Sequence, residues 1–456
     1  AVPPVPDKPT ITALATPAGE AAIALIRVSG PLSGTIAQEA FGRKSPPAAR
    51  KACLGNYRSL VGAHLDLAVY TYFEEGASYT GEAILEIACH GNPLIAQKVL
   101  DDLHARGCQL AEPGEFTRTA FLNQRMDLSQ AEAVMELIQA KSEKALAVAQ
   151  RHLQGGLGDR VRALSDRLIR LCALMEAYID FPEEDLPKED QDDPHDILAK
   201  ILNDIDLLIE TNQYHEALSQ GVRLAILGAP NAGKSSLFNA LLDRARAIVS
   251  KTPGTTRDFI SERITFGTLS LEIIDTAGLR KDGSEIERIG MARTLEVAKN
   301  ADFRILVLDT TTDFPELPND LLGQLSPENT LIAENKTDLG KSRDFGKHLP
   351  ALPRQRISAL TGCGLDAFRL CLREKLDTLV ELPGEETIVI NARHRTLLEE
   401  GRRLLLDAKQ TFSDNAPDEL AASDLRTALE TISSITETVG TEEILNEIFQ
   451  KFCIGK

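Results

Sequence analysis

The chain has 456 residues, of which 43% are hydrophobic, and a formal net charge of −18. This length suits about three domains with ordinary buried cores. The acidic balance argues against broad nonspecific binding to nucleic acid, whose phosphates attract basic surfaces. The seven cysteines are scattered without a CxxC pair, which argues against a disulfide framework or a zinc site and predicts a cytoplasmic protein. No apolar run approaches the roughly 20 residues of a membrane-spanning helix, so no membrane association is expected.

The first region, 1–122, alternates short apolar runs with Gly and Pro turns. The runs with the pattern of strands are "AAIALIRVSG" at 21–30, "LDLAVYTYF" at 65–73 and "AILEIACHGNP" at 83–93. Short runs of this kind, bounded by turn residues, predict a compact α+β domain.

From about residue 127 the apolar spacing becomes helical. Ser129 and Glu132 form a capping-box pattern that predicts a helix running to Gly155-Gly156. Further helices are expected at 157–180, 195–217, 391–412, 417–438 and 441–452. The sequence therefore predicts a helical domain in two parts, 123–218 and 383–456.

Two arginine clusters fall in these helices. They are Arg160, Arg162, Arg167 and Arg170, and Arg393, Arg395, Arg402 and Arg403. Solvated helix faces are favoured over RNA contact for both clusters.

Between the two helical parts, 219–382 alternates strands and helices. Continuous apolar runs at 222–227, 270–275, 303–309 and 329–334 are typical of parallel strands buried on both faces. The pattern predicts a Ras-like doubly wound α/β domain inserted into the helical domain.

The first of these runs is followed by "GAPNAGKSS", 228–236, which fits the phosphate-binding pattern G-x-x-x-x-G-K-[ST] between a strand and a helix. In this context the backbone N–H groups and the helix N-terminus meet the phosphates. Lys234 is expected to reach the β and γ oxygens, and Ser235 to hold Mg²⁺.

Three further motifs follow in the order that a GTPase needs. Asp275 in "DTAG" is placed for the Mg²⁺ shell, and the Gly278 N–H for the γ-phosphate. Asp338 in "NKTD" can accept two hydrogen bonds from guanine, which adenine cannot donate, so GTP is favoured over ATP. A backbone N–H of "SAL", 358–360, suits guanine O6, although Leu360 replaces the usual Lys or Arg. The sequence predicts a GTPase.

The sequence identifies the residues that promote GTP hydrolysis less directly than those that bind the nucleotide. Leu279 stands where Ras-like proteins have the glutamine that orients water. The carboxylates Glu285 and Glu287 follow, and Glu287 is the preferred candidate. The missing positive charge on the phosphates has two possible sources. One is an arginine finger from Arg257, Arg280 or Arg288. The other is a monovalent cation held by oxygens of Asn231 and the loop 250–258.

The chain ends in "FCIGK", 452–456, which resembles a prenylation box only in spacing, because Gly455 and Lys456 do not fit its last two positions. An apolar stripe at helical spacing predicts that the last helix docks and carries Cys453 on its last turn. The stripe consists of Leu445, Ile448, Phe449 and Phe452. Cys453 is then either a small buried residue or a functional thiol.

Taken together, these motifs resemble the tRNA modification GTPase family MnmE, also called TrmE. The resemblance rests on "ITALATPAGEAAIALIRVSG", "YTGEAILEIACHGNP" and "GEFTRTAFLNQRMDLSQAEA" in the first third of the chain. It also rests on "NAGKSS", "GTTRD", "DTAGLR" and "EIERIG" in the middle, and on the terminal "FCIGK". These segments span nearly the whole chain in the family's order.

The resemblance implies a potassium-activated GTPase with catalytic residues Glu287 and Cys453. It implies magnesium ligands at Ser235 and Thr256, and potassium ligands at Asn231, Ser250, Thr252 and Thr255. The residues expected to contact GTP fall in five stretches: Asn231, Ala232, Gly233, Lys234, Ser235 and Ser236; Ser250, Lys251, Thr252, Pro253, Gly254, Thr255 and Thr256; Asp275, Thr276, Ala277 and Gly278; Asn335, Lys336, Thr337 and Asp338; Ser358, Ala359 and Leu360.

The resemblance also implies that the N-terminal domain, 1–122, binds a 5-formyl- or methylene-tetrahydrofolate and builds a homodimer. The folate contacts fall on Arg27, Glu86, Arg125 and Lys456. The implied reaction adds an aminomethyl or carboxymethylaminomethyl group to C5 of the tRNA wobble uridine. It needs an FAD-dependent partner, MnmG, in a heterotetramer.

Two other functions share many of these motifs. One is a GTP-driven switch that binds RNA or ribosomes without chemistry on a base, and the other is a folate-dependent one-carbon transferase with an appended regulator. Folate binding separates the first from modification. Transfer without GTP or the partner separates the second.

Overall fold

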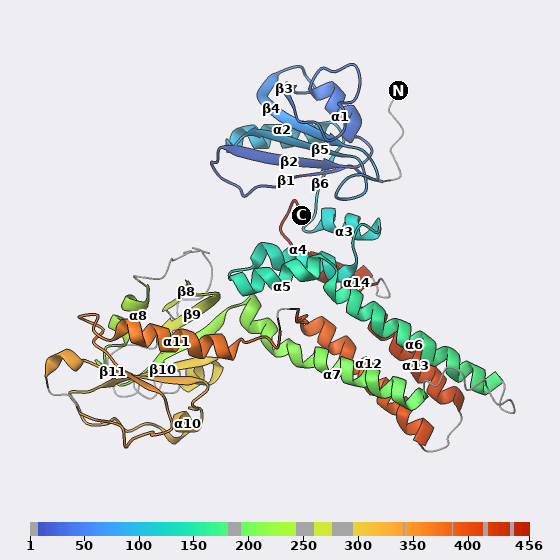
Figure 1. Cartoon of the computed structure of the whole chain (residues 1–456). Coiled ribbons are helices and arrows are strands. Elements are labelled where there is room, and N and C mark those ends of the chain that lie inside the picture. The colour runs from blue at the N-terminus through green and yellow to red at the C-terminus, as the bar shows by residue number, and fades with distance from the viewer. Residues whose placement is uncertain are drawn as a thin grey trace. The chain divides into compact units, whose positions relative to one another are not determined.

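The computed structural model describes residues 8–180, 193–242, 260–275, 295–340, 343–384, 386–413, 418–437 and 442–456. The chain forms two compact units, and Figure 1 shows their elements. The first unit comprises Ala1–Met135, His152–Ile201 and Leu397–Lys456, and the second comprises Glu136–Arg151 and Leu202–Thr396. No helix among the described residues is long and apolar enough to span a membrane.

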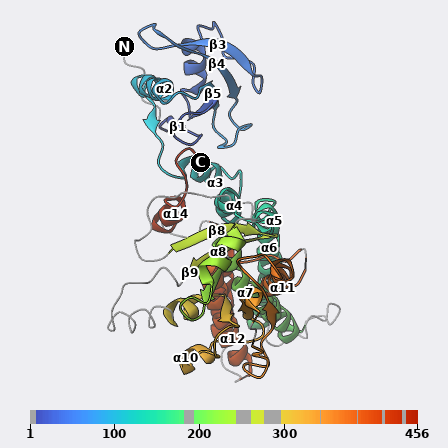
Figure 2. The same cartoon turned by 90° about the vertical axis from the view of Figure 1, so that its left-hand side faces the viewer.

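The first unit begins with a six-stranded sheet in the order β3-β4-β5-β2-β1-β6, part of which is visible in Figure 2. Its strands are β1 (Ile11–Leu14), β2 (Ile23–Ser29), β3 (Cys53–Arg58), β4 (His64–Phe73), β5 (Ile84–His90) and β6 (Gln109–Leu110). All neighbouring pairs are antiparallel except β1 and β6. The three runs expected to form strands correspond to β2, β4 and β5, which confirms that prediction.

One face of this sheet is covered by two helices. The other, called the open face, is buried at β1, where Ile11 and Ala13 pack with Phe116, and exposed at Ile23, Leu54 and Val69. The helices α1 (Ser33–Ala40) and α2 (Pro93–Ala105) supply Ile36, Val99 and Leu103 to the same buried cluster as Ile26 and Ile87 from the strands. The side chain of Asn92 caps α2 by accepting a hydrogen bond from the Leu94 N–H, and Pro93 occupies the first turn. Because side chains alternate along a strand, the intervening residues line the opposite face.

Helices follow the sheet, and one prediction about them is wrong. The run expected at 127–155 is two helices, α4 (Leu128–Gln139) and α5 (Glu143–Leu153). Ser142 immediately precedes the second helix and caps it, because its hydroxyl accepts from the Ala145 N–H. The capping box of α4 is also displaced from the predicted Ser129 and Glu132. Asp127 accepts from the Gln130 N–H, and the Gln130 side chain accepts from the Asp127 N–H.

Five other helices match their predicted positions closely. They are α6 (Gly156–Asp180), α7 (Pro194–Ser219), α12 (Ala392–Ser413), α13 (Asp418–Ser433) and α14 (Glu442–Phe449), whereas α3 (Glu115–Leu122) was not predicted. Within the first unit, α6 and α13 run side by side (Figure 1). The last helix ends at Phe449, three residues before the predicted end. Cys453 therefore lies beyond the helix and not on its last turn, which corrects the prediction.

The second unit contains a six-stranded sheet in the order β12-β11-β10-β7-β9-β8. Its strands are β7 (Val222–Leu227), β8 (Ile260–Phe266), β9 (Leu269–Asp275), β10 (Phe303–Asp309), β11 (Thr330–Asn335) and β12 (Arg354–Arg356). Only β8 is antiparallel to its neighbour. The four predicted strands are present and mutually parallel, which confirms the α/β fold.

Both faces of this sheet are buried, which explains its continuous apolar runs. Leu224 and Ile226 of β7 face one cluster, which includes residues of α8 (Lys234–Leu242) and α11 (Leu365–Leu379). Ala225 and Leu227 face another cluster, which includes Leu321 of the short α10 (Asn319–Leu322). The strand order reverses between β7 and β10, and ligands of open parallel sheets bind at the carboxyl ends of strands beside such a point.

Candidate functional site

The loop after β7 has the backbone of a phosphate cradle. Gly228 and Gly233 adopt φ angles of 145° and 99°, and Asn231 one of 64°. A Cβ on Gly228 would lie 2.3 Å from the Val307 carbonyl oxygen of β10, so only glycine fits there. Lys234 is buried, and its Nζ donates to the carbonyl oxygens of Gly228 and Ala229 at 2.8 and 2.9 Å.

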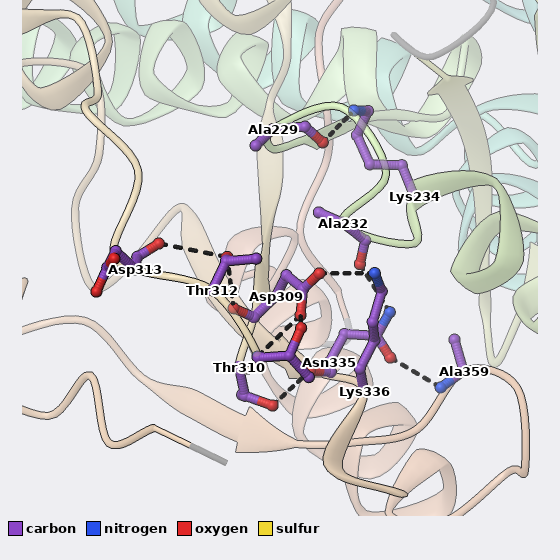
Figure 3. Close-up of polar contacts among 11 residues, drawn as sticks. Ala229, Ala232, Lys234, Asp309, Thr310, Thr312, Asp313, Asn335, Lys336 and Ala359 are labelled. Atoms are coloured by element: carbon purple, nitrogen blue, oxygen red, sulfur yellow. Dashed lines mark hydrogen bonds and ion pairs between the residues drawn. The ribbon is translucent and has the colours of Figure 1, made fainter. Parts of the chain in front are cut away.

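Asn335 joins this cradle to the predicted base-binding loop (Figure 3). Its side-chain Nδ2 donates to the Ala232 carbonyl at 2.8 Å, and its Oδ1 accepts from the Ala359 N–H at 2.9 Å. The side chain is buried, and a Cβ on Gly233 would lie 2.1 Å from its Nδ2. The structure therefore brings "NAGKSS", "NKTD" and "SAL" together around one amide.

Sequence reasoning missed Asp309, which is visible beside Asn335 in Figure 3. Asp309 ends β10, and its Oδ2 lies 2.6 Å from Lys336 Nζ. Thr311 donates to Oδ1 through both its N–H and its hydroxyl. Burial alone would raise the pKa of Asp309, but the hydrogen bonds from Lys336 and Thr311 outweigh it and hold the pKa below its ordinary value. The only signal in the sequence was an acidic residue ending a buried strand.

Lys336 leads into the turn that carries Asp338, the residue predicted to read the base. It has a left-handed backbone with φ of 67° and precedes a short 3₁₀ turn, Thr337–Leu339. Asp338 in this turn is exposed, and its carboxylate has no partner among the residues that the structure describes. Leu360 is exposed as well, and its N–H is likewise unpaired within the described part of the chain. Both groups are thus available to a ligand.

Two residues predicted to hold a divalent cation belong to elements that meet at the same end of the sheet. Ser235 lies in the first turn of α8, and Asp275 ends β9 beside β7. Hydroxyl and carboxylate oxygens are the ligands that Mg²⁺ prefers. The donor set fits the ion together with phosphate oxygens.

The remaining predicted residues of this domain lie outside the described residues. They are Ser250, Lys251, Thr252, Pro253, Gly254, Thr255, Thr256, Thr276, Ala277, Gly278 and the catalytic candidate Glu287. The alternatives Glu285, Arg257, Arg280 and Arg288 fall there too.

The first unit holds a second cluster of predicted residues on the open face of its sheet. Arg27 and Glu86 are cross-strand neighbours on β2 and β5. Arg27 donates through Nε and Nη2 to Glu86 Oε1 at 3.0 and 2.8 Å. The guanidinium also lies 5.7 Å from the ring centroids of Tyr79 and Phe116. Two predicted folate contacts therefore bind each other in this structure.

The C-terminal tail, residues 450–456, reaches the Arg27–Glu86 pair. Arg27 Nη1 lies 3.4 Å from the Gly455 carbonyl oxygen, and Figures 1 and 2 both show the C-terminus beside α3. Lys456 is half-buried, and Cys453 is exposed. Exposure is incompatible with the reading of Cys453 as a small buried residue. Arg125 is exposed beside Gly81, and its guanidinium has no partner among the described residues.

The cradle after β7, the buried asparagine, the exposed Asp338 and the strand order define a P-loop domain of the guanine-nucleotide-binding class. Two family models match the chain. The model described as the MnmE helical domain matches residues 128–453, and the model described as the GTP-binding protein TrmE N-terminus matches residues 10–125.

Curated relatives match over their full length. The tRNA modification GTPase MnmE of Opitutus terrae is 44% identical, covering 100% of both chains. The protein of the same name from Akkermansia muciniphila is 42% identical, covering 98% of this chain and 99% of its own. The G domain of the T. maritima FeoB iron transporter is a solved structure with 30% identity, which covers 35% of this chain and 99% of its own at a TM-score of 0.24. The chain belongs to the MnmE family of tRNA modification GTPases.

Proposed function

We propose that this protein is a potassium-activated GTPase that modifies C5 of the tRNA wobble uridine, with a tetrahydrofolate as one-carbon source and an FAD-dependent partner. The support is the similarity over the full length to proteins named tRNA modification GTPase MnmE. A second support is the P-loop site with an exposed Asp338 in one unit. A third, in the other unit, is an exposed thiol two residues before Gly455, whose carbonyl oxygen meets Arg27.

Discrimination of GTP from ATP rests on Asp338. Its exposed carboxylate accepts from guanine N1–H and the 2-amino group, and the Leu360 N–H donates to guanine O6. Adenine offers neither donor and would leave the carboxylate desolvated and unpaired, which costs about 1–3 kcal/mol or more. Asn335 holds the two loops together through both ends of its amide, and the amide has a second Nδ2 hydrogen that can donate to the base.

In the hydrolysis step, Lys234 exchanges its two P-loop carbonyls for the β and γ oxygens of GTP. Ser235 and Thr256 would hold Mg²⁺, whose charge would neutralise the charge that develops on the phosphates. Asn231, Ser250, Thr252 and Thr255 would hold K⁺, which would supply a positive charge in place of an arginine finger. Glu287 orients the attacking water.

The N-terminal sheet is the proposed site for the folate and for dimerisation. Glu86 presents a carboxylate to the amino-pyrimidine edge of a pterin, and Arg125 and Lys456 present cations to its glutamate carboxylates. The open face carries exposed apolar side chains that a homodimer through the N-terminal domain would cover. These are Ile23, Leu54, Leu67 and Val69.

The decisive experiment measures wobble uridine by mass spectrometry in tRNA from a deletion strain, with and without this chain. Restored modification by the wild type supports the proposal. It should fail with Asp338→Asn, because an amide cannot accept from both guanine donors. GTP-dependent association with RNA or ribosomes in a strain whose wobble uridine does not change would favour the switch without base chemistry.

A further inference from the structure

The C-terminal tail is held at two points, with the thiol between them. Phe452 is buried and packs in a cluster with Phe449, Phe121 and Leu128. Gly455 is buried at the other end. Between these anchors Cys453 and Ile454 are both exposed. The backbone thus forms a short clamped loop that presents a thiol.

Two glycines make the clamp possible. Gly455 has φ of 91°, and a Cβ there would lie 2.7 Å from the Leu14 carbonyl oxygen and 2.9 Å from Ala15 Cα. Gly114, the N-cap of α3, has φ of 72°, and its Cβ would lie 2.7 Å from the Phe449 carbonyl oxygen. Any side chain at either position would push the tail away from the end of β1 or from α3.

Arg27 is the polar group at the second anchor. Its guanidinium is oriented by two hydrogen bonds to Glu86 and by the rings of Tyr79 and Phe116. This fixed side chain turns its remaining edge toward the Gly455 carbonyl oxygen. That contact, at 3.4 Å, is long for a hydrogen bond. A contact of this length is kept only while Glu86 holds the guanidinium in its present orientation. Arg27 is 14% exposed and Glu86 is 25% exposed, so the pair is only partly screened by water.

We propose that Arg27 is a positioning residue, which fixes the C-terminal tail on the N-terminal sheet and thereby holds the loop that presents the Cys453 thiol. One guanidinium binds the acidic side chain on one edge and the tail on the other. This inference deepens the proposed function and rests on it for the chemical purpose of the thiol. The docking of the tail rests on the geometry alone.

The test compares Arg27→Met with the wild-type full-length protein. Methionine keeps an unbranched apolar side chain next to the rings of Tyr79 and Phe116, and it removes the positive charge and every hydrogen bond. A matched control is Arg43→Met, because Arg43 also donates a hydrogen bond within this domain, to the Tyr70 hydroxyl, and does not contact the tail. Thermal melting and circular dichroism of each variant establish that it is folded.

Two readouts follow the tail directly. One is removal of Lys456 by a carboxypeptidase specific for basic residues. The other is the rate at which a maleimide labels Cys453, measured on the tryptic peptide that begins after Lys451. Arg27→Met should speed removal of Lys456 about tenfold, the effect of losing a hydrogen bond to a charged group. It should also change the labelling rate of Cys453, and Arg43→Met should leave both rates unchanged.

A second variant keeps the inference testable if Arg27→Met does not fold. Gly455→Ala leaves Arg27 intact but forces the tail off the sheet, so it should reproduce both effects. Lysine at position 27 cannot bind Glu86 and the Gly455 carbonyl oxygen together. The double variant Arg27→Lys with Gly455→Ala should therefore show nearly the same two rates as Gly455→Ala alone. If the arginine variants leave both rates at the wild-type value while Gly455→Ala changes them, Arg27 does not position the tail. Titration of the wild type with 5-formyl-tetrahydrofolate tests the proposed folate site separately, so the two failures are distinguishable.

Discussion

Asp309 is the residue whose role is clearest in the structure and least visible in the sequence. Asp309→Asn should raise the Kd for GDP about tenfold, because a neutral amide no longer fixes Lys336 and the turn that carries Asp338. The turnover number at saturating GTP should remain near the wild-type value, since no contact to the γ-phosphate is removed. Titration with a fluorescent GDP and steady-state kinetics measure the two quantities.

Asp313→Asn is the matched control for this prediction. Asp313 also forms an ion pair, with Arg343, but its side chain is 87% exposed. Exposed pairs contribute little, so nucleotide affinity should change less than twofold. A lowered turnover number with unchanged affinity in Asp309→Asn would contradict a positioning role.

The Asp309 pair also has a defined pH dependence. The folded-state pKa of this carboxyl is lowered, so its contribution to stability is complete above the ordinary value of about 4 and is lost as the pH falls through the lowered pKa. The difference in melting temperature between wild type and Asp309→Asn should therefore be constant from pH 5 to 7. It should shrink between about pH 4 and 3.

The proposed potassium site can be tested by substitution of Asn231. The backbone conformation of this residue decides which substitutions can be interpreted. Its φ of 64° makes alanine a strained replacement. Asn231→Gly accepts this φ and removes the side-chain oxygen, whereas Asn231→Asp keeps both. GTP turnover should be much faster in K⁺ than in Na⁺ for the wild type and for Asn231→Asp, and equal in the two salts for Asn231→Gly. Equal wild-type rates at matched ionic strength would refute the cation site.

At the scale of elements, the start of α4 shows how a cap is misread by two residues. Asp127→Ala should destabilise the first turn of α4 by about 1 kcal/mol, because it removes the acceptor for the Gln130 N–H. Hydrogen exchange at that amide should accelerate about fivefold. Ser129→Ala should have a smaller effect, since the Ser129 hydroxyl donates to Asp127 and does not cap the helix. Equal acceleration of exchange by both variants would instead support the capping box that the sequence predicts at Ser129.

The strands of the second sheet were predictable because each is buried on both faces and therefore appears as a continuous apolar run. The break between α4 and α5 was not, since "AKSE" contains neither Gly nor Pro, and only the contact of Ser142 with the next turn reveals it. The end of α14 was misplaced for a related reason. Phe452 keeps the helical spacing and is buried, but it does so from a turn after the helix, where it packs on Phe449.

The candidate site likewise has parts that the sequence predicts and parts that it does not. The motif letters located the phosphate cradle, Asp338 and the tail. They could not show that Asn335 bridges two loops or that Arg27 pairs with Glu86, because both depend on which strands are neighbours in a sheet. Arg27 and Glu86 are 59 positions apart in sequence and directly opposite in register.

At the scale of the whole molecule, the feature to consider is where the chain passes from one unit to the other. The chain crosses between them after Met135, Arg151, Ile201 and Thr396, and each crossing falls inside a helix, in α4, α5, α7 or α12. Within the second unit, Ala145 and Val148 of α5 pack in the cluster of the nucleotide-binding sheet. In the first, Leu153 at the end of the same helix packs in the cluster of Phe449 and Phe452. The chain therefore passes from one unit to the other within helices and not within loops.

The two activities should nevertheless separate in Cys453→Ser. The thiol is exposed in the first unit, so its replacement by a hydroxyl of similar size should shift the melting temperature by less than about 2 °C. GTP turnover depends on the second unit and should stay near the wild-type rate. Wobble modification in cells should be lost, because a hydroxyl is far less acidic than a thiol. Cys363→Ser is the control, since Cys363 is also exposed but lies in the second unit, and it should modify tRNA normally. Full modification by Cys453→Ser would show that the tail contributes shape and not chemistry.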